Sequence, residues 1–99
     1  MKKHAIAYVD ATAKAYGGFY FTEENGFRYF KMQSIDTVHN NEVKAIEAAA
    51  EDNSFEDITI YSDSTVAIKR CSQKERFRNV SLIYIPRSFN RLADKLIRL

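Results

Sequence analysis

The sequence has little of what marks secreted, membrane-bound or disordered proteins. Its single cysteine, Cys71, cannot form a disulfide within the chain, which favours a reducing compartment. No proline-, glycine- or serine-rich run interrupts the 99 residues, and 45% of them are hydrophobic, so long disordered segments are not expected. The first apolar run, Ala5 to Val9, is stopped by Asp10, too early for a signal sequence or a membrane span. We therefore expect one cytoplasmic domain over residues 1–99, with no membrane contact.

Charge is small in total and uneven along the chain. Residues 1–52 contain six Lys/Arg against eight Asp/Glu, whereas residues 53–99 contain nine against five. The densest basic stretch, residues 69–78, has five cations and one acid. Such a segment suits a phosphate backbone, although a solvated helix end accounts for it equally well.

Apolar periodicity alternates between strand and helix patterns. The resulting order is βββ-α-β-α-β-α, which predicts an α/β fold with a five-stranded mixed sheet and helices on its faces. An Asn25-Gly26 pair between the second and third strands is typical of a tight hairpin. The expected strands are residues 4–9, 17–21, 27–32, 58–62 and 80–85, and the expected helices start near 37–41, 65 and 89 and end near 52, 71 and 99.

Four acids occupy positions that this order can bring together. Asp10 and Asp63 each end a strand, and the carboxyl ends of parallel neighbours meet at one edge of a sheet, where ligand sites lie. Glu42 falls in the expected first turn of the first helix, and Asp94 lies on the flank of the last helix. We therefore predict that these four carboxylates converge.

Each acid also has a simpler explanation. Asp63 can cap the helix that follows it, and the helix dipole favours Glu42 in a first turn. Asp10 can open a turn, and Asp94 can pair with Arg98 one helical turn later. These explanations do not account for three acids at element ends facing the same crevice, with a fourth beside it.

Clustered carboxylates repel one another unless cations neutralise them. Oxygen ligands without a neighbouring His or Cys cluster select hard cations such as Mg²⁺. Two such ions about 4 Å apart can activate a water and stabilise the leaving oxygen of a phosphodiester. The predicted chemistry is that of a metal-dependent nuclease.

Four stretches of the sequence carry a family resemblance. The segments YVDATAKAYGGFYF, NNEVKAIEAAA, IYSDSTVAI and IPRSFNRLADKL resemble, in order, the four sequence blocks of type 1 ribonuclease H and its reverse-transcriptase-like relatives. The last block is the most specific, because it reproduces the pattern P-R-x-x-N-x-x-A-D-x-L. Together the blocks span nearly the whole chain, and the resemblance implies a compact ribonuclease H-like domain.

The resemblance implies an endonuclease that cuts the RNA strand of RNA/DNA hybrids and leaves 5′-phosphate and 3′-hydroxyl ends. It implies two Mg²⁺ ions, for which Mn²⁺ is expected to substitute. By position, Asp10 would bridge both ions, and Glu42 and Asp63 would hold the ion near the leaving 3′ oxygen. Asp94 would complete the site of the ion that activates the attacking water.

The same resemblance suggests residues that bind nucleic acid. Some lie where the family contacts the minor groove and the RNA 2′-hydroxyls, although Asn and Ser are also ordinary helix caps. Others are cations of the basic stretch, and two belong to the last block. The expected binding residues are Asn40, Asn41, Ser64, Thr65, Lys74, Arg76, Arg78, Arg87 and Asn90.

Two departures from the family pattern leave alternatives open. Many relatives carry a His in the loop before the last helix, where this chain offers Arg87, so turnover is expected to be slower. Residues 72–79 leave no room for the basic handle of larger members, which predicts weak, salt-sensitive binding or a homodimer through the last helix or the basic stretch. The alternatives to an active ribonuclease H are a non-catalytic nucleic-acid-binding module and a related carboxylate DNA nuclease or recombinase.

Overall fold

The sheet has five strands in the order β3-β2-β1-β4-β5 in the computed structural model, which describes residues 4–99. The α/β class, the mixed five-stranded sheet and the order of strands and helices agree with the sequence prediction. Two short 3₁₀ helices, η1 and η2, were not predicted. The elements are β1 (Ala5–Ala11), β2 (Ala15–Thr22), β3 (Gly26–Gln33), α1 (Val38–Glu51), β4 (Glu56–Ser62), α2 (Thr65–Ser72), η1 (Glu75–Phe77), β5 (Asn79–Tyr84), η2 (Arg87–Phe89) and α3 (Arg91–Arg98).

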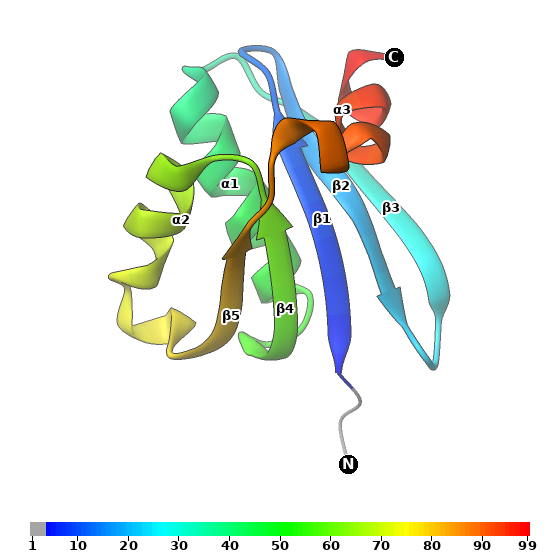
Figure 1. Ribbon diagram of the computed structural model, residues 1–99, viewed down its shortest axis with the longest axis vertical. Coiled ribbons are helices and arrows are strands. Elements are labelled where there is room, and N and C mark those ends of the chain that lie inside the picture. The colour runs from blue at the N-terminus through cyan, green and yellow to red at the C-terminus, as the bar shows by residue number, and fades with distance from the viewer. Residues whose placement is uncertain (1–3) are drawn as a thin grey trace.

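β1 is the central strand and determines where the strand ends meet. It pairs antiparallel with β2 and parallel with β4, with Tyr8 opposite Tyr61 in the parallel register. β4 in turn pairs parallel with β5. The carboxyl ends of β1, β4 and β5 therefore lie at one edge of the sheet (Figure 1).

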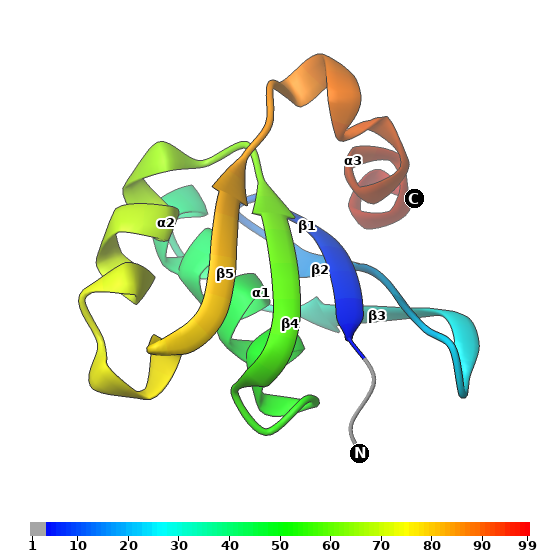
Figure 2. The same cartoon turned by 60° about the horizontal axis from the view of Figure 1, so that its bottom comes forward.

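Helices cover the two faces of the sheet unequally. α1 packs on β1, β2 and β4, and α2 packs against α1 and β5, whereas α3 contacts β2 and β1. Figure 2 shows α1 and α2 on one side of the sheet and α3 on the other. Because α3 is only eight residues long, it covers one end of its face and leaves the rest of that face without a helix (Figure 1).

The hydrophobic core lies between the sheet and the pair α1 and α2. Alternate residues of β1 point into it, and the apolar stripe of α1 meets them, as strand and helix periodicity requires. Cys71 is fully buried here, as expected of a core thiol, and burial raises its pKa to about 11. The fully buried core side chains include Val9, Ile46, Ile58 and Ile60.

Strand pairing between β1 and β2 depends on glycine. A Cβ atom at Gly18 would lie 2.1 Å from the carbonyl oxygen of Tyr8. In the hairpin between β2 and β3, only Gly26 of the Asn25-Gly26 pair has a positive φ, of 66°. The two strands are thus joined by a tight three-residue loop, residues 23–25, and Gly26 is the first residue of β3.

Two sequence-based placements need correction. Glu42 is the fifth residue of α1 and lies beyond its first turn, because the helix begins at Val38 after the Thr37 cap. Apolar spacing predicted a buried face on the last helix formed by Phe89, Leu92, Ala93, Leu96 and Leu99. Of these only Ala93 is buried, together with Ile97, whereas Phe89, Leu92 and Leu99 are 74%, 72% and 89% exposed. Residue 89 belongs to η2, so the helix starts later and presents a different stripe to the sheet.

Within residues 4–99, no helix is both long enough and apolar enough to cross a membrane.

Candidate metal centre

Asp10 lies near the end of the central strand, at the middle of the candidate site. Its residue is 2% exposed, and its Oδ1 accepts a hydrogen bond of 2.8 Å from the amide of Ala11. Opposite it on β2 is Gly17, where a Cβ atom would lie 2.2 Å from the carbonyl oxygen of Phe30 on β3. The position of Asp10 follows from strand order, because β1 is paired on both sides.

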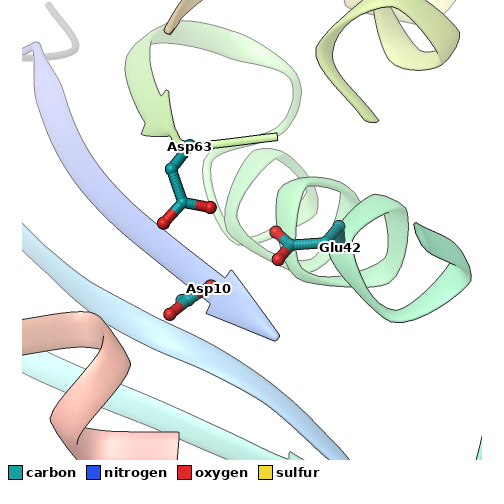
Figure 3. Close-up of side chains that lie close together, drawn as sticks. All are labelled: Asp10, Glu42 and Asp63. Carbon is teal, nitrogen blue, oxygen red and sulfur yellow. The ribbon is translucent and has the colours of Figure 1, made fainter. Parts of the chain in front are cut away.

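Two further acids meet Asp10 from different elements. Asp63 follows β4 directly, and Glu42 projects from α1, so three separate segments converge (Figure 3). One carboxylate oxygen from each of the three lies within 4.8 Å of the others. The side chain of Asp63 is 6% exposed, and the Glu42 residue is 3% exposed.

Local structure determines how Asp63 comes close to Asp10. The parallel pairing of β1 with β4 brings Asp63 beside Asp10. Ser64 Oγ, and not Asp63, caps α2 by accepting a hydrogen bond of 3.1 Å from the amide of Ala67. The capping explanation for Asp63 therefore does not hold, and its carboxylate is available to the site.

A fully buried amide holds the start of α1 in place. Asn41 Nδ2 donates to the carbonyl oxygens of Thr12 and Ser34, each at 2.8 Å, and its Oδ1 accepts from Ser34 Oγ at 2.7 Å. These bonds attach the helix to the ends of β1 and β3 just before Glu42. Asn41 thus orients the helix that carries Glu42.

The three carboxylates repel one another in a poorly solvated place. Burial, followed by the charges of Asp10 and Asp63, raises the pKa of Glu42 from 4.5 to about 9. Burial also raises the pKa of Asp10 from 3.8 to about 6, with a further contribution from Asp63. The charged forms are therefore disfavoured unless a cation enters.

Two buried oxygens at this site have no hydrogen-bond partner among residues 4–99, namely Glu42 Oε2 and Asp63 Oδ2. Buried acceptors normally have one, so such oxygens indicate a missing ligand or ion. An all-oxygen donor set of this kind fits a hard divalent cation such as Mg²⁺ or Mn²⁺. The residues present therefore fit a metal ion.

Asp94 lies beside this cluster but not within the group of three. Its carboxylate is close enough to Asp10 to influence the pKa of that group, and it accepts a hydrogen bond of 2.8 Å from Arg98 Nε. The bond from Arg98 is the main cause of the lowered pKa of Asp94. Both sequence-based interpretations of Asp94 are thus partly met: it pairs with Arg98, and it adjoins Asp10.

A buried side chain anchors the helix that carries Asp94. Asn90 is 2% exposed, and its Nδ2 donates a hydrogen bond of 2.7 Å to the carbonyl oxygen of Val9, next to Asp10. Asn90 and Asn41 are both buried. Both amides are used within the protein, where they position acids of the site, and direct binding of nucleic acid by these two residues stays a prediction.

Arg87 is the nearest cation to the cluster recorded among residues 4–99. Its Nε lies 4.0 Å from Asp63 Oδ2, and its side chain is 72% exposed. It sits in η2, above the edge where β4 and β5 end. This guanidinium can contact an anionic ligand that approaches the carboxylates from solvent.

The remaining predicted binding residues lie along α1, α2 and the segment that follows. Asn40 is exposed, donates to Asp36 Oδ1 at 2.9 Å and accepts from Arg70 at 3.2 Å. Thr65 is exposed at the start of α2, next to the capping residue Ser64. Sequence reasoning had not included Arg70 among the binding residues, although it belongs to the basic stretch.

Two carboxylates partly neutralise the five cations of the basic stretch within the protein. Lys74 Nζ lies 3.0 Å from Glu47 Oε2, and Arg76 pairs with the same carboxylate. Arg78 pairs with Glu75 at 3.1 Å. These partners reduce the positive charge offered to a phosphate backbone, and the acid involved on α1 is distant in sequence.

No family model matches this sequence, and no curated protein matches it significantly.

Proposed function

We propose that this protein is a metal-dependent endonuclease of the ribonuclease H-like type that hydrolyses the RNA strand of RNA/DNA hybrids. The observation that carries the proposal is the convergence of Asp10, Glu42 and Asp63, with buried carboxylate oxygens that lack partners. The resemblance of the four sequence blocks supports the same activity, because these acids lie in three of them.

Asp10, Glu42 and Asp63 would hold the metal, and Asp94 would contribute from α3. Bound divalent ions supply an activated water and stabilise the charge on the leaving oxygen. The protein's own part is to keep the carboxylates together: β1 and β4 carry two of them, and the amides of Asn41 and Asn90 anchor the helices that carry the others. Arg87, which is exposed beside Asp63, would contact a phosphate of the substrate.

A second candidate function is a nucleic-acid-binding module without turnover. The observation in its favour is the short connection between α2 and β5, which contains only η1 and leaves no room for the basic handle of larger ribonucleases H. Weak, strongly salt-dependent binding is expected under either proposal.

The deciding experiment uses a labelled RNA/DNA hybrid with Mg²⁺ or Mn²⁺. We expect cleavage of the RNA strand that stops with EDTA and with Asp63→Asn. The control is Glu56→Gln, an exposed acid at the opposite end of β4, which should retain activity. Binding without cleavage would support the second candidate, and cleavage of duplex DNA with intact hybrid would point to a DNA nuclease.

A further inference from the structure

The face of the sheet that carries α3 is mostly uncovered and apolar. Strand register places Tyr8, Phe19 and Tyr29 in one row across β1, β2 and β3, and Phe21 and Phe27 in the next. The rings contact one another, with centroid separations of 6.4 Å for Phe19 and Tyr29 and 5.1 Å for Phe21 and Phe27. On a monomeric protein such a row of aromatic side chains normally packs against something.

The start of α3 extends this apolar surface. Phe89 and Leu92, together with Tyr8, Phe19 and Phe27, line a groove of about 760 Å³ between the helix and the sheet. We define the open face by six exposed hydrophobic residues on this side of the sheet and at the start of α3. They are Tyr8, Phe21, Phe27, Tyr29, Phe89 and Leu92, with exposed fractions of 39%, 36%, 79%, 68%, 74% and 72%.

The size of the open face fits association between two protein chains. Taking about 200 Å² for a large apolar side chain, these fractions expose about 700 Å². A standard protein interface removes about 800 Å² from each partner. The open face therefore supplies nearly all the area that one subunit of a stable dimer contributes.

Residues of opposite charge lie at two ends of the open face. Glu24 lies in the turn between β2 and β3 at one end, and Arg91 begins α3 at the other (Figure 1). All six residues that define the face are uncharged, so two copies meet on it without burying like charges. A two-fold axis through its middle brings the turn of one copy toward the α3 start of its partner, acid toward base.

We propose that the open face is the interface of a homodimer in which a second copy of this chain covers the same residues. The partner's aromatic side chains fill the groove beside α3, and the acidic turn faces the basic start of the helix. Asp10 lies on the same side of β1 as Tyr8, one row nearer the strand end, but none of Asp10, Glu42 and Asp63 belongs to the residues that define the open face. The test measures association alone, so failure of the dimer and failure of the proposed hydrolytic activity are distinguishable.

The test is the oligomeric state measured by sedimentation over protein concentrations from about 0.1 to about 100 μM, a range set by the affinities of interfaces of this size. We expect the full chain to sediment as a dimer at the upper end. Phe27→Glu and Leu92→Glu should each weaken dimerisation at least tenfold. Both side chains are more than 70% exposed, so folding should be kept, which circular dichroism will check. The matched control is Ile35→Glu, 86% exposed in the connection between β3 and α1, which should dimerise normally.

A charge reversal tests the orientation of the two copies. Arg91→Glu should weaken the dimer about three- to tenfold, and adding Glu24→Arg in the same chain should restore it. A chain that stays monomeric throughout, or one whose dimer Ile35→Glu disrupts as strongly as Phe27→Glu, would overturn the proposal. A monomer in which Phe27→Glu abolishes binding of a single-stranded oligonucleotide would overturn it too, and would assign the face to base stacking.

Discussion

Substitution of Glu42 by glutamine should stabilise the protein in the absence of divalent ions. The unfolded chain releases the Glu42 proton near pH 4.5, whereas burial and the neighbouring Asp10 raise the pKa in the folded protein to about 9. Between these values the folded state binds more protons than the unfolded state, so the free energy of unfolding falls as pH rises. Glutamine stays neutral in both states, so the variant does not lose stability in this way as the pH rises.

The size of the effect follows from the two pKa values. A pH of 7.5 lies three units above the pKa of 4.5 that Glu42 has in the unfolded chain. Each unit stabilises the ionised unfolded state by about 1.4 kcal/mol relative to a folded state in which Glu42 stays protonated. The limit is therefore about 4 kcal/mol, and we expect about 2 to 4 kcal/mol because the amide replaces the carboxyl imperfectly. At pH 5 the gain should fall below about 1 kcal/mol. A gain of about 2 kcal/mol corresponds to a rise in Tm of about 10 °C for a domain of this size.

Urea unfolding in EDTA at pH 5 and pH 7.5 measures both values. Glu51→Gln is the matched control, since it makes the same change at the exposed last residue of α1 and should shift stability by less than about 0.5 kcal/mol. The reasoning is wrong if Glu42→Gln is no more stable than the wild type at pH 7.5, or if its gain is the same at both pH values.

Three further predictions concern the metal, an anchoring amide and a close strand contact. Mn²⁺ should raise Tm more at pH 8 than at pH 5, because protons compete for Asp10, and Asp63→Asn should remove this gain; equal shifts at both pH values in a fluorimetric melt would contradict the metal assignment. Asn90→Ala should cost about 1 to 3 kcal/mol in urea unfolding, because it leaves the carbonyl beside Asp10 without its donor, and a neutral result would rule out the anchoring role. Gly18→Ala should cost about 2 to 3 kcal/mol by forcing β1 and β2 apart, and an unchanged Tm would disprove that close approach.

The sequence by itself determined the elements and part of the site. Alternation of strand and helix patterns depends on neighbours two to four residues apart, so the order of elements was predicted correctly from local periodicity. Asp10 and Asp63 were assigned to one edge because the carboxyl ends of parallel strands meet there. That inference needs only the strand order and not the details of packing.

Only the tertiary structure decided which side chains are accessible and what they contact. Asn41 and Asn90 look like surface residues in the sequence, yet their amides bind backbone carbonyls of distant segments. Lys74 and Arg76 look free for a phosphate, yet both pair with Glu47 on another helix. The local sequence pattern indicates which residues of a segment face the core, but not which distant segment they contact there. Contacts between segments far apart in the chain form only when the whole sheet and its helices pack together.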